Sequence, residues 1–133
     1  MCVTFGCGSV CSSSERQKVS TKSACEAELV GLSDGLGIPV QLQNFLLTTG
    51  YKLPPVLAMQ DSTSATFLAA SGRSSSGATR HAGTRYFWVC DRAKRKQAEL
   101  KHVVTLLVTA GVLTKPAQGV LLTGIRCRLL GHD

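Results

Sequence analysis

A short apolar run, Val56-Leu-Ala-Met59, constrains the fold of this chain more than any other segment. It follows Pro54-Pro55 and leads into Gln60-Asp61. Consecutive apolar residues are typical of a strand buried on both faces, because a strand with one wet face alternates apolar and polar residues. Such a strand needs elements packed on each side of its sheet, so the run predicts an α/β domain.

The chain before this strand is expected to form a hairpin and then a helix. Residues 2–5 and 9–12 are the two arms, joined by the glycine-bearing turn Gly6-Cys7-Gly8. Ser23 and Glu26 then form a Ser-x-x-Glu capping box, which predicts the start of a helix.

The buried stripe of this helix is made of residues at helical spacing: Cys25, Leu29, Leu32 and Leu36. Pro39 interrupts the pattern, and residues 41–47 resume it. We therefore expect a break at the proline and a second helical piece that ends near Gly50.

The chain after the strand continues the alternation of helices and strands. The patterns predict a helix over 62–70, a Ser/Gly-rich loop over 73–77, a helix over about 79–97 and a strand over 99–103. In the tail, apolar residues alternate with polar ones as in a one-sided strand: Ile125, Cys127 and Leu129. The succession predicts a mixed α/β domain, with an antiparallel hairpin at one side and parallel pairing at the other.

Length, charge and cysteines narrow the classes of function. A chain of 133 residues has the length of one domain, and its net charge of +7 is typical of proteins that meet phosphates. The six cysteines are unevenly spaced and follow no secretory leader, so we expect free thiols in a protein of the cytoplasm or nucleus that is not secreted. No apolar run approaches about 20 residues, so no membrane span is expected.

Two acids are candidates for chemistry. Glu28 lies on the flank of the buried helical stripe, where an acid is costly unless it has a partner such as a cation, whereas Glu26 is assigned to the cap. Asp61 ends the apolar strand, and ligands of such sheets gather at the carboxyl ends of strands. The alternatives are a solvated Glu28 and an Asp61 that caps the next helix.

A basic face on the predicted 79–97 helix is the second candidate site. Its residues recur at helical spacing: Arg85, Trp88, Arg92 and Arg95. Trp88 could stack on a base while the arginines neutralise phosphates, or it could pack inside the protein while the arginines are solvated. Arg80 and His81 just before this face are further candidate contacts, although His81 could also cap the helix.

These segments, in their order, resemble the ribonuclease H domain of copia-type retrotransposon polyproteins. The resemblance extends from Cys2 to Pro116, which makes residues 1–116 the domain and 117–133 a tail of unknown role. Its five motifs are Cys2-Val-Thr-Phe-Gly-Cys-Gly, Ser20-Thr-Lys-Ser-Ala-Cys-Glu-Ala-Glu-Leu, Gln60-Asp-Ser-Thr-Ser-Ala, Thr79-Arg-His-Ala-Gly-Thr-Arg-Tyr-Phe and Val112-Leu-Thr-Lys-Pro116.

The resemblance implies hydrolysis of RNA in RNA-DNA hybrids by two Mg²⁺ ions held by four acids. It places Glu28 and Asp61 among these metal-binding, catalytic acids. The family's first aspartate lies on a strand before the hairpin, and this sequence begins within the hairpin, while Gly111 stands at the position of the fourth acid. We therefore expect a ribonuclease H-like mixed sheet flanked by helices, without its first, central strand, and a catalytically incomplete site.

Partners and alternatives follow from the same resemblance. The expected partners are an RNA-DNA hybrid or other nucleic acid and the reverse transcriptase part of a polyprotein. The alternatives are a non-catalytic nucleic-acid-binding module and a decayed element fragment without activity. A missing central strand would leave its neighbours unpaired, so we also expect marginal stability and a tail that does not fill the gap.

Overall fold

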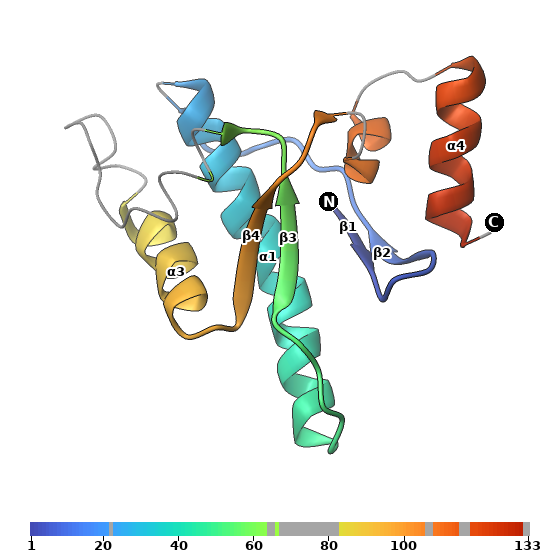
Figure 1. The fold of residues 1–133 in the computed structure, drawn as a ribbon. Coiled ribbons are helices and arrows are strands. Elements are labelled where there is room, and N and C mark those ends of the chain that lie inside the picture. The colour runs from blue at the N-terminus through green and yellow to red at the C-terminus, as the bar shows by residue number, and fades with distance from the viewer. Residues whose placement is uncertain (22, 64–65, 67–82, 106–107, 115–117, 132–133) are drawn as a thin grey trace. The chain divides into compact units, whose positions relative to one another are not determined.

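The computed structural model describes residues 1–21, 23–63, 66, 83–105, 108–114 and 118–131 (Figure 1). It is a mixed α/β structure, as predicted, with one antiparallel and one parallel two-stranded sheet among these residues. The chain forms two compact units, Gln17–Val103 and Met1–Arg16 with Val104–Asp133.

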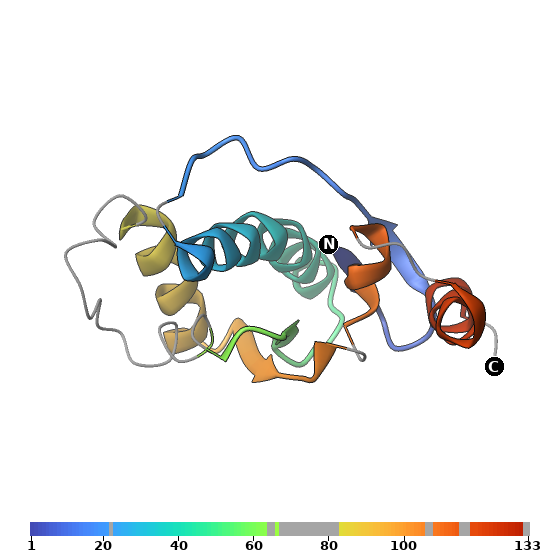
Figure 2. The same cartoon turned by 90° about the horizontal axis from the view of Figure 1, so that it is seen from above.

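The unit Gln17–Val103 contains a parallel pair of strands covered by two helices. Its elements are α1 (Ala24–Thr48), β3 (Val56–Gln60), α3 (Gly83–Lys94) and β4 (Ala98–His102). The register runs from Val56 opposite Ala98 to Gln60 opposite His102. Figure 2 shows α1 along one face of this strand pair. The predicted strand over 99–103 is thus confirmed, one residue earlier.

The core of this unit lies between the two helices and one face of the sheet. Leu32 and Val89 are buried against Ala58. Leu36 and Val40 are buried against Ala98. Residues 56, 58 and 98 therefore face the helices, because side chains alternate along a strand.

The prediction that β3 is buried on both faces is wrong. Leu57 is 46% exposed and Met59 is 52% exposed, so its second face is open. An uninterrupted apolar run does not indicate which face of the strand packs against helices. In this structure only one of the two faces does.

Helix α1 begins where the capping box predicts. The Ser23 side chain accepts a hydrogen bond from the Glu26 backbone N–H at 3.2 Å, which satisfies one of the first free donors of the helix.

The break predicted at Pro39 is wrong, because α1 continues through it to Thr48. Proline has no N–H to donate to the carbonyl of Gly35, but Leu36 and Val40 on either side of it are both buried in one cluster. Tertiary packing therefore keeps the two halves in one helix.

The unit of Met1–Arg16 and Val104–Asp133 contains the predicted hairpin. Strands β1 (Cys2–Thr4) and β2 (Ser9–Ser12) pair antiparallel, and Gly6 and Gly8 in the turn have φ of 104° and 69°. Glycine adopts these left-handed conformations at little cost, whereas other residues rarely do, so the turn depends on both glycines.

This unit also contains two helical segments, η3 (Thr109–Leu113) and α4 (Gly119–Leu130). The strand-like alternation read in the tail is therefore not a strand. Within α4 Ile125 is buried, at 8% exposure. Because residues 125–129 are helical, the expectation that they supply no strand to β3 is confirmed.

Several sequence predictions fall outside the described residues: most of the helix over 62–70, the loop over 73–77 and the start of the helix over 79–97. Arg80 and His81 are among them. In the part of the chain that the structure covers, no helix combines the length and the apolar character needed to span a bilayer.

Replacing Pro39 with Ala should stabilise the protein by about 1 to 3 kcal/mol, because it restores a helical hydrogen bond to the carbonyl of Gly35. Thermal and urea unfolding followed by circular dichroism would measure this change. Gly31→Ala, at an open position of the same helix, gives the gain from helix propensity alone, about 1 kcal/mol. A Pro39→Ala protein less stable than the parent would contradict the account of α1.

Candidate functional site

The two acids singled out from the sequence both lie at the carboxyl end of β3. Gln60, its last residue, donates a hydrogen bond from Nε2 to Oε2 of Glu28 at 2.8 Å. Asp61 follows Gln60 directly and is half-buried. Glu28 on α1 and Asp61 after β3 therefore lie at the same end of the strand pair; Glu28, Gln60 and Asp61 are called the acid corner.

The partner of Glu28 differs from the one expected. Its side chain is exposed, and it is held by a neutral amide rather than by a cation. The hydrogen bond fixes one carboxylate oxygen, which leaves Oε1 for another ligand. The sequence analysis gave Gln60 no role, although it is the first residue of one of the five motifs.

Glu26 is the more buried of the two helix acids, at 5% exposure. The sequence prediction gave Glu28 the position nearer the core, because it counted from the leucine stripe. Glu26 lies three residues before Leu29 and four before Val30, which are 0% and 2% exposed. Counting from this pair would have placed Glu26 on the buried side.

The acids act on the neighbouring thiol of Cys25. Burial raises the pKa of Cys25 above its ordinary value, and the negative charges of Glu26 and Glu28 raise it further. The thiol therefore stays protonated at neutral pH and is a poor nucleophile.

The basic face of α3 is engaged within the protein. Trp88 packs against the two buried clusters between the helices and the sheet. The guanidinium carbon of Arg92 lies 5.5 Å from the centre of the Trp88 ring. Arg85 lies 3.6 Å from a carboxylate oxygen of Asp34. These contacts favour the packed interpretation of Trp88 over base stacking.

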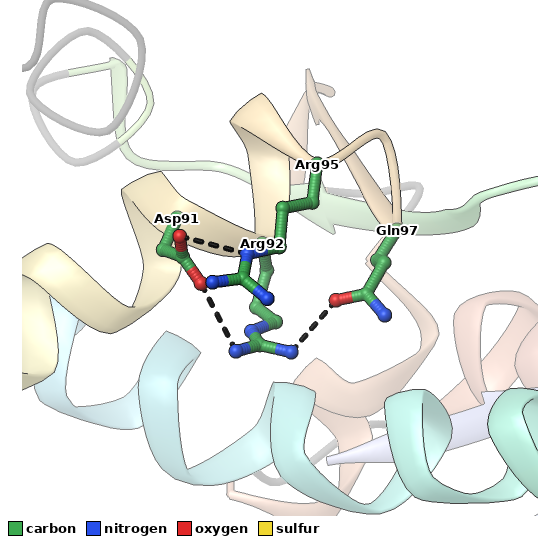
Figure 3. A network of polar contacts seen from close by, with 4 residues as sticks. All are labelled: Asp91, Arg92, Arg95 and Gln97. Carbon is green, nitrogen blue, oxygen red and sulfur yellow. Dashed lines mark hydrogen bonds and ion pairs between the residues drawn. The ribbon is translucent and has the colours of Figure 1, made fainter.

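Asp91 organises the other two arginines of this face (Figure 3). Arg92 donates to Asp91 Oδ2 at 3.0 Å and to Gln97 Oε1 at 2.7 Å. Arg95 donates from Nε to Asp91 Oδ1 at 3.0 Å. The sequence prediction did not include Asp91, but its spacing of four residues from Arg95 on a helix was a usable signal.

The structure separates the acids from the arginines near the end of α3. Glu28 is bound at Gln60, whereas Arg92 is bound to Gln97, which precedes Ala98. Ala98 lies opposite Val56 at the other end of the strand pair. The acid corner and Arg92 therefore lie at opposite ends of the five-residue sheet, whereas Arg85 lies in the first turn of α3, next to Tyr86, which packs against Leu29.

The acid corner fits a single hydrated divalent cation better than a pair of metal ions. Carboxylate oxygens are ligands that Mg²⁺ prefers, but two carboxylates leave most of an octahedral shell to water. No group of three or more His, Cys, Asp or Glu side chains suited to a metal occurs among the described residues.

Comparisons with known proteins identify no relative. No protein-family model, no curated protein and no solved structure matches this chain significantly.

Cys25 should be alkylated more slowly than the exposed Cys7 near pH 8.5, because its raised pKa leaves less thiolate. Peptide mass spectrometry after timed exposure to iodoacetamide would measure both rates. Glu28→Gln should lower the pKa of Cys25 and speed its alkylation modestly, since burial is the larger cause of the shift.

The same shift has a consequence for stability. The pKa of Cys25 is higher in the folded protein than in the unfolded chain, so the protonated thiol adds to the free energy of unfolding below its ordinary pKa. This contribution is lost as the pH rises through the raised pKa.

Faster alkylation of Cys25 than of Cys7 by iodoacetamide would contradict the raised pKa of Cys25.

Proposed function

We propose that this chain is a retrotransposon-derived ribonuclease H-like domain in which Glu28 and Asp61 are two of the family's four metal-binding acids. The observation that supports this most is the hydrogen bond between Gln60 and Glu28, because it joins two separate motifs of the resemblance at the carboxyl end of one strand. The order of hairpin, helix, strand, helix and parallel strand also agrees with that family.

The chemistry expected of the acid corner is cation binding without hydrolysis. When bound, Mg²⁺ in this family supplies Lewis-acid stabilisation of the phosphate oxygens. In this chain Gln60 orients the carboxylate of Glu28, and Asp61 would supply a second carboxylate. Position 111, which the resemblance gives to a further acid, is glycine and has no side chain to offer.

The 133-residue chain should not cleave a labelled RNA-DNA hybrid in either Mg²⁺ or Mn²⁺, because two carboxylates do not hold the two ions that hydrolysis requires. Denaturing gel electrophoresis over several hours would measure cleavage. Glu28→Gln is the control for contaminating nuclease. Cleavage by the parent chain that disappears in Glu28→Gln would overturn the proposed inactivity and show that the acids present suffice.

Mn²⁺ should bind at the acid corner with a dissociation constant on the order of 1 mM or weaker, because most of its ligands would be water. Paramagnetic broadening of the backbone amide signals of Glu28, Gln60 and Asp61 would locate the ion. The broadening should be lost in Glu28→Gln. Asp34→Asn removes one charge from an exposed position on the same helix and should leave it in place.

Equal broadening in the parent and in Glu28→Gln would contradict cation binding at the acid corner. Loss of broadening in Asp34→Asn as well would assign the effect to general electrostatics rather than to a site.

A further inference from the structure

The turn from α3 into β4 holds a lysine in a backbone conformation that favours glycine. Lys96 has φ of 55°, and every other described residue with positive φ is a glycine. Its N–H donates to Ala93 O at 3.0 Å, and the N–H of Gln97 donates to Arg92 O at 3.0 Å. This pair of bonds is the Schellman arrangement at a helix end, in which the left-handed residue is usually glycine.

A side chain at this position carries a conformational cost that glycine would avoid. A positive charge near the end of a helix is favourable, but Arg92 and Lys94 already supply it within the last turn. A strained residue that helix capping does not require points to a role for the side chain itself.

Lys94, Arg95 and Lys96 form an exposed group, called here the basic turn. Asp91 is the one acid in the stretch 91–97 and is shared by Arg92 and Arg95. Within the described part of the chain, no carboxylate lies within ion-pair distance of Lys94 or Lys96. Lys94 and Lys96 therefore present uncompensated positive charge, whereas Arg95 is paired with Asp91.

The backbone of the basic turn is held in place. The two Schellman hydrogen bonds close it, and the side-chain bond from Arg92 to Gln97 spans it (Figure 3). Cations on a fixed backbone lose less conformational entropy on binding than cations on a free loop.

The chemistry of this surface fits phosphate groups arranged in a row. No large apolar side chain occurs between residues 91 and 97, so the turn lacks what a membrane-surface segment inserts into lipid. We propose that the basic turn binds the phosphate backbone of a nucleic acid without reading its base sequence.

This site differs from the one expected on the face of Arg85 and Trp88, and it lies at the end of the strand pair away from Gln60. It rests on the proposed function only for the choice of nucleic acid as the polyanion.

The test is a pair of matched substitutions with opposite effects on stability. Lys96→Gly relieves the positive φ and should raise the thermal midpoint, whereas Lys94→Gly weakens the last turn of α3 and should lower it. Both remove one charge from the basic turn. If the turn binds phosphates, both should weaken binding to a fluorescent RNA-DNA hybrid, measured by anisotropy.

Salt dependence identifies the interaction. Each substitution should reduce the slope of log affinity against log salt by about 0.9, and the double variant by about twice that. Lys52→Ala, which removes an exposed lysine from the loop before β3, should change the slope less than either. The loss should be equal for hybrids of different sequence.

Unchanged binding in Lys96→Gly would overturn the proposal. So would binding that follows stability, with Lys96→Gly stronger and Lys94→Gly weaker than the parent. Binding to vesicles of anionic lipid but not to the hybrid would also overturn it. All measurements contain EDTA, so a failure here leaves the Mn²⁺ result at the acid corner standing, and the reverse also holds.

Discussion

The packing of Leu32 on α1 and Val89 on α3 against Ala58 of β3 is the contact on which the acid corner depends. Leu32 lies four residues after Glu28, one turn along the same helix face. Ala58 lies two residues before Gln60, on the same side of the strand. Once Leu32 rests on Ala58, the chain geometry brings Glu28 next to Gln60, and the observed 2.8 Å hydrogen bond follows from core packing. Asp61 follows Gln60 directly in the chain.

The same packing separates the acid corner from the basic turn along the strand pair. The parallel register fixes Val56 opposite Ala98 at one end and Gln60 opposite His102 at the other. The acid corner belongs to the second end, and the basic turn immediately precedes the first. The acid corner and the basic turn therefore lie at opposite ends of the strand pair, although Asp91 still pairs with arginines beside the basic turn.

Local signals in the sequence predicted the local structure of this chain. The glycines of the hairpin turn and the capping box at Ser23 specify conformations within a few residues, and both predictions are confirmed. The placement of Glu28 and Asp61 at the same strand end came from the resemblance together with the rule for strand ends. The break predicted at Pro39 was wrong because the residues on both sides of it are buried in the core. This burial outweighs the tendency of proline to interrupt a helix, and it depends on tertiary packing for which the local sequence gives no signal. The partners of the α3 arginines were missed for a similar reason, since Asp34 and Gln97 reach them through the fold.

The exposed face of β3 shows how an apolar strand is accommodated beside only one layer of helices. Leu57 pairs in register with Glu99, and Met59 pairs with Lys101. Paired residues in parallel strands point to the same side, so each exposed apolar side chain has a charged neighbour on β4. Charges beside an open strand oppose edge-to-edge association of copies, because pairing would bury them. The outer face of the sheet therefore carries both charged and apolar side chains. For this reason one layer of helices is enough, although an uninterrupted apolar run in the sequence predicts a layer on each face.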